Sequence, residues 1–236
     1  MKILRLIRSN IPNTITCLNL LSGCIATVFA FHYDSMYGNL TGYEMAFIFI
    51  GAATVFDFCD GLSARLLHAY SALGKELDSL SDLVSFGLAP AVLIYSAMTA
   101  NGAGWASFLA FAVTVFGALR LAKFNIDDRQ TSSFIGLPIP SNAIFWIGWI
   151  AWINSHTYPG DAVMILLIVV VSALMVSRMR MFSMKVKTLE WRSNVRRYAL
   201  LIGAVLFLIM EQLSGLAWTI VLYVVLSATA RKNEQY

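Results

Sequence analysis

Long stretches with few charged side chains constrain this chain more than any other feature of its sequence. The hydrocarbon core of a bilayer holds no water to hydrogen-bond the backbone, so a spanning segment must satisfy its own backbone groups, as a helix does. Such a helix needs roughly 20 apolar residues to cross the core. Eight apolar segments are predicted membrane spans: residues 13–32, 43–66, 73–97, 105–124, 140–153, 161–177, 198–210 and 216–230. The predicted fold class is therefore all-α, a polytopic transmembrane helical bundle.

The composition supports this fold class. Hydrophobic residues make up 58% of the 236 residues, charged residues make up 13%, and the mean hydropathy is +0.71. An average soluble domain is about a quarter charged, so this chain has too little charge to cover a soluble surface. A soluble enzyme, a disordered tail and a collagen-like fibre are excluded, and we predict a single integral membrane domain over residues 1–236.

The basic residues predict the orientation of the spans. With the N-terminus in the cytosol, all 17 Lys and Arg fall in the two tails, in the turns on the cytosolic side or at the cytosolic ends of the spans. This distribution is typical of membrane proteins, whose cytoplasmic loops carry an excess of Lys and Arg. Both termini are therefore predicted to be cytosolic. The net charge of +4 is explained in the same way, without a nucleic-acid partner.

Four aspartates lie where acidic residues are costly. Asp57 and Asp60 are in the second predicted span, and Asp78 and Asp82 are in the third. An ionised carboxylate at bilayer depth costs several kcal/mol, so such residues usually have partners and a function. Each pair lies on one face of its helix, because its members are three or four residues apart. A short turn joins the two helices, so both faces are expected at one cavity near the cytosolic surface.

Four converging carboxylates would repel one another unless cations bind between them. Carboxylate oxygens are hard ligands that suit Mg²⁺ or Mn²⁺, whereas zinc sites use mainly His and Cys. Arg65 ends the same helix, and its guanidinium suits a diphosphate group. The alternative is that these aspartates are ordinary helix-end residues that face water.

The spacing of these residues resembles the signature of the CDP-alcohol phosphotransferase family at all eight fixed positions. The signature reads Asp57-x2-Asp60-Gly61-x2-Ala64-Arg65-x8-Gly74-x3-Asp78-x3-Asp82. The resemblance implies a membrane enzyme that transfers a substituted phosphate from a CDP-linked donor to an alcohol and releases CMP. It also implies a six-helix core, to which this chain would add about two C-terminal helices, and a homodimer.

Three flanking stretches are similar to membrane-integral phosphatidylserine synthases, a branch of this family. They are residues 12–16 with Asn19, residues 81–90, and residues 136–140. The resemblance covers roughly residues 8–180. It implies CDP-diacylglycerol as the donor and L-serine as the acceptor.

The family pattern also implies roles for individual residues. It assigns Asp57, Asp60, Asp78 and Asp82 to two divalent cations, Mg²⁺ or Mn²⁺, and it assigns Asp82 also to the general base. The same resemblance implies that five residues contact the CDP group: Asn13, Thr16, Gly61, Arg65 and Ser71.

The acceptor pocket is predicted from the chemistry of serine. A cation should meet the serine carboxylate, and Arg120 ends the fourth span on the cytosolic side. Hydrogen-bonding candidates for this pocket are Ser85, Asn125 and Ser141. Alternatively, Arg120 is an ordinary anchor of the positive-inside type.

Other functions remain open at this point. The same chemistry could use glycerol 3-phosphate or an inositol phosphate as the acceptor, or an archaeal ether lipid as the donor. A membrane transporter is the alternative outside the enzymes, because intramembrane acids can be ion sites. Many transporters contain internal repeats, and this sequence shows none. We expect an integral protein of the cytoplasmic membrane with its active site facing the cytosol.

Overall fold

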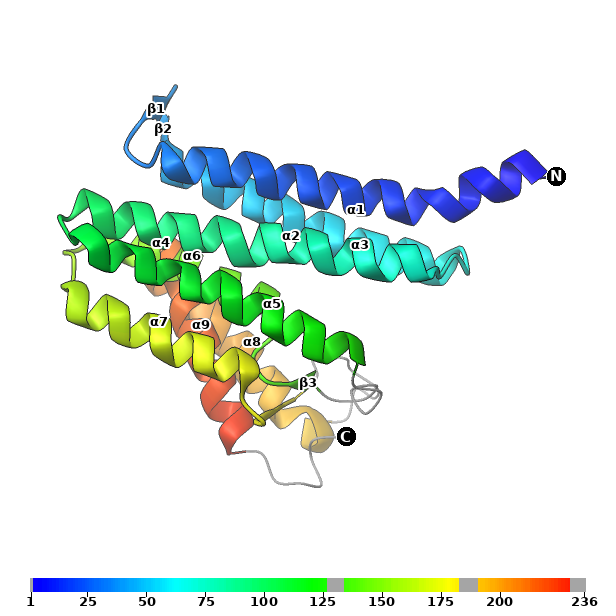
Figure 1. The fold of residues 1–236 in the computed structure, drawn as a ribbon. Coiled ribbons are helices and arrows are strands. Elements are labelled where there is room, and N and C mark those ends of the chain that lie inside the picture. Colours follow the sequence, from blue (N-terminus) through cyan, green and yellow to red (C-terminus); the bar gives the residue numbers. More distant parts are fainter. Residues whose placement is uncertain (1, 127–133, 183–190, 230–236) are drawn as a thin grey trace. The chain divides into compact units, whose positions relative to one another are not determined.

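The computed structural model describes residues 2–126, 134–182 and 191–229. The chain forms two compact units, Met1–Val115 and Phe116–Tyr236. Within the described ranges the structure is almost entirely helical, and its strands are only two residues long (Figure 1). The predicted all-α fold class is confirmed.

The first unit is built around three long helical stretches. The third stretch is continuous, although a π-helical turn interrupts its α-helical hydrogen bonding. The first helix packs along both of the others. The elements in chain order are α1 (Lys2–Phe31), the hairpin strands β1 (Met36–Tyr37) and β2 (Leu40–Thr41), α2 (Gly42–Leu66), α3 (Ala72–Asp82), the π-helical turn η1 (Leu83–Leu88), α4 (Ala89–Ala100) and the 3₁₀-helix η2 (Gly104–Phe111).

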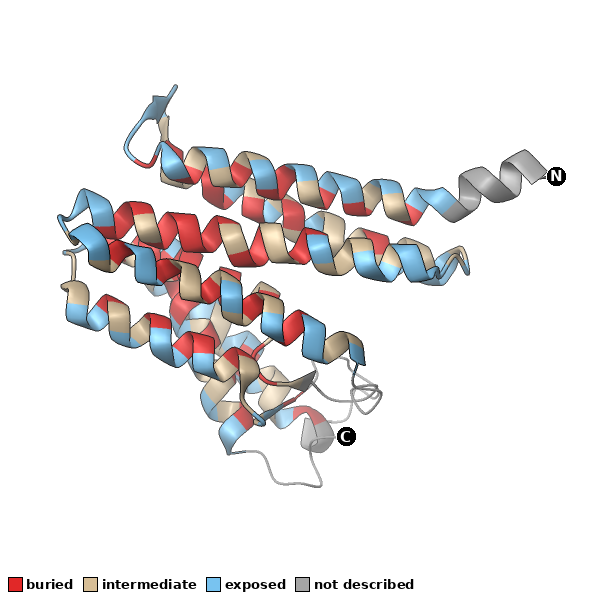
Figure 2. Ribbon diagram, in the orientation of Figure 1, coloured by how far each residue is buried: buried red, intermediate tan, exposed pale blue. Residues whose placement is uncertain are grey.

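The core of the first unit lies along η1 and α4, where burial is most continuous (Figure 2). Phe86, Leu93 and Met98 are fully buried there. The buried positions of α1 and α2 are often small, such as Ala26 and Ala53. Small side chains let helix backbones approach closely, which is the usual way helices pack in a membrane.

The second unit contains the remaining helices. Helix α9 packs against α8 and α6, and Gly148 of α6 faces Ala217 with no room for a larger side chain. The guanidinium of Arg196 donates to the carbonyl oxygens of Leu226 and Thr229, where α9 ends. Helix α5 begins in the first unit, and strands β3 and β4 pair antiparallel. The elements of the second unit in chain order are α5 (Ala112–Ile126), β3 (Phe134–Ile135), α6 (Ile139–Ser155), α7 (Asp161–Val176), β4 (Arg180–Met181), α8 (Trp191–Glu211), the 3₁₀-turn η3 (Gln212–Ser214) and α9 (Gly215–Ala228).

Within the described residues, five helical stretches are long and apolar enough to cross a membrane, which makes this an integral membrane protein. Helix α7 is also apolar but shorter. The number of spans and the side of the termini stay predictions. The five stretches are Asn10–Phe31, Gly42–Leu66, Ala72–Ala100, Gly104–Ile126 and Asn194–Ala228.

Each of the eight predicted segments contains a helix, but two helices begin several residues earlier than predicted. Helix α1 begins at Lys2 rather than at residue 13, and α8 begins at Trp191 rather than at residue 198. Hydropathy marks only the apolar part of a helix, whereas backbone hydrogen bonds continue through polar residues. Helix α1 continues through Pro12, although a proline inside a helix removes one backbone donor and its ring clashes with the preceding turn.

Candidate active site

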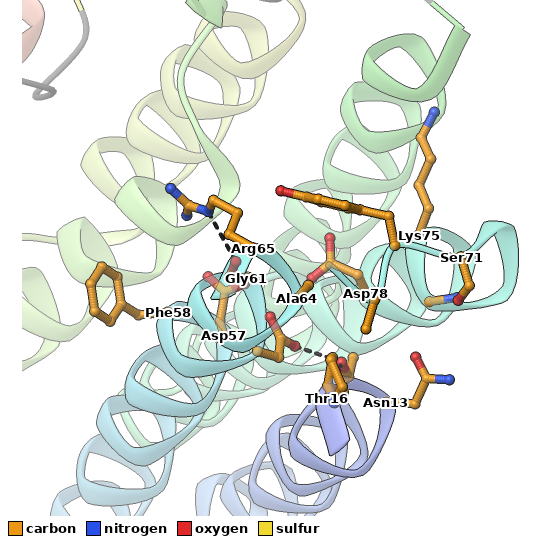
Figure 3. A pocket seen from close by; sticks show the side chains of 15 residues that line it. Asn13, Thr16, Asp57, Phe58, Gly61, Ala64, Arg65, Ser71, Lys75 and Asp78 are labelled. Atoms are coloured by element: carbon orange, nitrogen blue, oxygen red, sulfur yellow. Dashed lines mark hydrogen bonds between the residues drawn. The ribbon is translucent and has the colours of Figure 1, made fainter. Parts of the chain in front are cut away.

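A cavity of about 430 Å³ lies among α1, α2 and α3 in the first unit (Figure 3). Three of the four predicted metal-binding aspartates line it, and Asp82 does not. All five residues predicted to contact the CDP group line it as well: Asn13, Thr16, Gly61, Arg65 and Ser71. The structure therefore brings together residues that are far apart in the sequence.

The three carboxylates in the cavity come from two helices. Asp57 and Asp60 are on α2, Asp78 is on α3, and one oxygen from each lies within 4.8 Å of the others. Asp60 is buried, and Asp57 and Asp78 are half-buried. Three acidic oxygens at this separation repel one another in a poorly hydrated place. This donor set fits a hard divalent cation such as Mg²⁺ or Mn²⁺.

Helix α1 contributes a hydroxyl to this cluster. The Oγ1 atom of Thr16 lies 2.6 Å from Oδ2 of Asp60 and 3.0 Å from the carbonyl oxygen of Pro12. A hydroxyl has one proton, and the short distance to the carboxylate indicates that it donates to Asp60. Figure 3 shows this bond between α1 and α2 as a dashed line that ends at Thr16.

Asp82 lies apart from the other three carboxylates. It is the last residue of α3, one turn beyond Asp78, and it is 8% exposed. The Nδ2 atom of Asn19 donates to its Oδ1 atom at 3.4 Å. The assignment of Asp82 to the metal and to the general base stays a prediction.

The turn between α2 and α3 brings the aspartates of the two helices together. His68 adopts a left-handed conformation with φ of 50° just after α2. The Ala69 amide donates to the Ala64 carbonyl at 3.0 Å, and the His68 amide donates to Arg65 at 3.3 Å. These two bonds form a Schellman motif, which ends the helix and reverses the chain. Ser71 then begins α3, because its Oγ atom accepts the Gly74 amide at 2.9 Å.

Arg65 and Gly74 shape the rim of the cavity. The Nε atom of Arg65 donates to the Gly61 carbonyl at 2.9 Å, which orients the planar guanidinium. A Cβ atom at Gly74 would lie 2.9 Å from Oδ1 of Asn13 and 3.0 Å from Oγ of Ser71. Gly74 thus lets these two polar side chains line the same space.

Lys75 is a lining residue that the sequence analysis missed. It is three residues before Asp78, so the helical period already places it on the same face. Two exposed aromatic residues, Phe58 and Tyr70, also line the cavity. Arg65 is therefore accompanied by a second cationic side chain.

The predicted acceptor residues are divided between the two units. Ser85 is buried, donates to the Asn19 carbonyl at 3.0 Å, and is not among the residues that line the cavity. Arg120, Asn125 and Ser141 belong to the second unit. Arg120 is 7% exposed, and its guanidinium carbon lies 5.3 Å from the centre of the Phe124 ring. The assignment of these four residues to a serine pocket stays a prediction.

The cavity lies within a region that matches a known family. A family model described as CDP-alcohol phosphatidyltransferase matches residues 9–177. This chain belongs to that family. The CDP-alcohol phosphatidyltransferase region ends just after α7, so α8 and α9 lie beyond it. Membership in this family favours the enzyme over the transporter.

Several relatives within the family share one name, CDP-diacylglycerol–serine O-phosphatidyltransferase. The Bacillus subtilis protein is 39% identical over 128 residues, which cover 54% of this chain and 70% of that protein. The Helicobacter pylori strain J99 protein is 30% identical over 219 residues, which cover 91% of this chain and 87% of that protein. The Mycobacterium leprae protein is 36% identical over 149 residues, 60% of this chain, and the match spans about half of that relative, 46%.

Proposed function

We propose that this protein transfers the phosphatidyl group of CDP-diacylglycerol to the hydroxyl of L-serine, giving phosphatidylserine and CMP. The observation that carries the proposal is the cavity in which three carboxylates and Arg65 meet, in a chain of the CDP-alcohol phosphatidyltransferase family. The names of its relatives support serine as the acceptor.

The donor would bind with its diphosphate at the rim of the cavity. The Arg65 guanidinium is planar and can hold two phosphate oxygens at once, and Lys75 adds a second positive charge. Asn13 and Ser71 offer hydrogen bonds beside them. The acyl chains of the donor would stay in the lipid, which explains why the enzyme is a membrane protein.

The residues that would hold two divalent cations are Asp57, Asp60, Asp78 and Asp82, with Thr16 fixing one oxygen of Asp60. Bound Mg²⁺ or Mn²⁺ would stabilise negative charge on the diphosphate and make the acceptor hydroxyl more acidic. The carboxylates contribute by holding this positive charge in a fixed place before the reaction begins.

The reaction itself is a single displacement at phosphorus. The serine oxygen forms a bond to the phosphorus that carries diacylglycerol, while the bond from this phosphorus to the CMP oxygen breaks. CMP leaves with the electron pair, and Asp82 takes the proton of the serine hydroxyl. Positioning and electrostatic stabilisation supply most of the rate enhancement in phosphoryl transfer, and Arg65 provides both.

Arg120 is the proposed partner of the serine carboxylate. A buried guanidinium in a membrane-spanning helix is costly, and such residues usually serve a function. Ser85, Asn125 and Ser141 are the proposed hydrogen-bonding residues of the same pocket.

We place the enzyme in the cytoplasmic membrane as a homodimer with its active site facing the cytosol. The distribution of all 17 Lys and Arg supports this orientation. Cysteine replacing Ser35, in a variant without the native cysteines, should react with an impermeant reagent added to intact cells. Protection of that cysteine would invert the orientation.

The decisive experiment is an acceptor screen with purified protein, CDP-diacylglycerol and Mg²⁺ or Mn²⁺. CMP release should require L-serine, stop with EDTA and return when the cation is restored. Asp57→Asn should abolish release, whereas Asp34→Asn, in the exposed loop after α1, should not. Release with glycerol 3-phosphate instead of serine would overturn the acceptor, and full release in excess EDTA would overturn the role of the cations.

A further inference from the structure

Asn19 is a fully buried amide on α1, three residues after Thr16 and on the same face of the helix. Its Nδ2 atom donates to Oδ1 of Asp82 at 3.4 Å. Only the NH₂ group of an amide can approach an ionised carboxylate favourably, so this contact fixes which way the side chain is turned. Helix α1 thus contacts one aspartate of the cavity through Thr16 and the separate Asp82 through Asn19.

Two further hydrogen bonds hold the backbone of α1 against the third helical stretch. The hydroxyl of Ser81 donates to the Thr16 carbonyl at 3.2 Å, and the hydroxyl of Ser85 donates to the Asn19 carbonyl at 3.0 Å. Ser81 and Ser85 flank Asp82 in the sequence. A Cβ atom at Gly23 would lie only 2.7 Å from the Cα atom of Ser85, so the two backbones are as close as they can be.

The π-helical turn begins immediately after Asp82. In this turn the Ala89 amide donates to the Val84 carbonyl, five residues back. The hydroxyl of Thr114 donates to the Gly87 carbonyl at 3.2 Å. Single π-helical turns inside α-helices are frequently found at functional sites. Asp82 therefore sits at a point where the helix geometry changes and where α1 is fixed closely against it.

The amide of Asn19 is not explained by packing alone. Its Oδ1 atom is buried and has no hydrogen-bond partner within the part of the chain that the structure describes. A buried polar atom without a partner is destabilising, and leucine has nearly the same shape without that cost. The gain that offsets this cost must come from the Nδ2 side of the amide, which is the side that contacts Asp82.

We propose that Asn19 is a positioning residue for Asp82, and this inference rests on the proposed function. Its amide holds Oδ1 of Asp82 and thereby orients the carboxylate that takes the proton of the acceptor hydroxyl. Asn19 itself touches neither substrate. It acts on the chemical step, through the orientation of one carboxylate.

A double-mutant cycle tests this inference. Asn19→Leu should lower kcat for CMP release by about tenfold or more, a part of the roughly 10²–10⁴-fold contribution of a general base, while the KM values of donor and acceptor change less than about threefold. In an Asp82→Asn background the same substitution should change kcat less than about twofold, because residues that act through each other are not additive. Ser22→Ala is the matched control on α1, since Ser22 is also buried and three residues further along; its small effect should be equal in both backgrounds.

Two measurements separate positioning from a purely structural role. Thermal unfolding of purified Asn19→Leu in detergent should occur at or above the wild-type temperature, because the unpartnered oxygen is gone. Binding of CDP in the presence of Mn²⁺, measured by calorimetry, should change less than about threefold. An equal loss of kcat in both Asp82 backgrounds, or a lower unfolding temperature with weaker CDP binding, would overturn the inference. If the screen selects an acceptor other than serine, the cycle is run with that alcohol, so the two proposals can fail separately.

Discussion

The hydroxyl oxygen of Thr16 lies 2.6 Å from Oδ2 of Asp60, and this contact joins residues that are 44 positions apart. It connects α1, which contributes no acidic residue to the cavity, to the carboxylate cluster on α2 and α3. The bond holds one oxygen of Asp60 in place, so the arrangement of the cluster depends on how α1 packs against the other helices.

Thr16→Val should weaken cation binding by about tenfold, since a hydrogen bond to a charged group contributes about 1.5–3 kcal/mol. Valine keeps the shape of threonine and removes only the hydroxyl. The Mn²⁺ concentration needed for half-maximal CMP release measures the effect. Thr14→Val is the matched control, because Thr14 is exposed on the same helix and donates only to the Asn10 carbonyl. Equal behaviour of the two variants would contradict the role of Thr16.

Asp82→Asn should lower turnover by about 100-fold or more, the scale of general-base catalysis. Asparagine keeps the size of the side chain and one oxygen but cannot take up a proton. CDP binding should be partly retained, because Asp82 is one of four proposed cation ligands and is not among the residues that line the cavity. Steady-state kinetics and CDP calorimetry on the same preparation check both statements, and near-normal turnover would remove Asp82 as the base.

Arg65→Lys should raise the KM of CDP-diacylglycerol more than the KM of serine. Lysine keeps the charge but loses the planar group that can hold two phosphate oxygens, and it lacks the Nε atom that donates to the Gly61 carbonyl. The expected change in donor KM is about tenfold, the equivalent of one such hydrogen bond. Kinetics with each substrate varied in turn give the comparison, and a larger effect on serine would reverse the assignment.

Arg120→Ala should have the opposite pattern, with a higher serine KM and a nearly unchanged donor KM. The physical reason is loss of the charge proposed to meet the serine carboxylate. Arg178→Ala is a suitable control, because Arg178 is exposed and lies just after α7. An unchanged serine KM in the Arg120 variant would show that the acceptor pocket is elsewhere, and the proposal for the aspartates would be unaffected.

His68 allows a test of the turn between α2 and α3. Its left-handed conformation costs an ordinary residue about 1–2 kcal/mol, and glycine avoids most of this cost. His68→Gly should raise the unfolding temperature, and His68→Val should lower it, because a β-branched residue is least tolerated there. Thermal unfolding in detergent measures both. CMP release by the glycine variant should stay within about twofold of wild type if the turn serves only to reverse the chain.

The sequence by itself determined where the helices lie along the chain and which of them carry the acidic residues. Whether a segment forms an apolar helix depends on its own residues, and each of the eight predicted segments contains a helix. The spacing of Asp57, Asp60 and Asp78 also required only the helical period, since residues three or four apart share a face. Two consecutive helices that are joined by a short turn lie side by side, because the turn is too short to separate them.

Only the tertiary structure decided how α1 meets these helices. The sequence assigned all four aspartates to one metal site and Asp82 also to the general base, whereas the structure groups three of them and places Asp82 in contact with Asn19. This separation depends on the close approach of α1 to the third stretch at Gly23 and on the π-helical turn after Asp82. The contacts of α1 with this stretch join residues more than 60 positions apart, and no local period or hydropathy pattern contains that information.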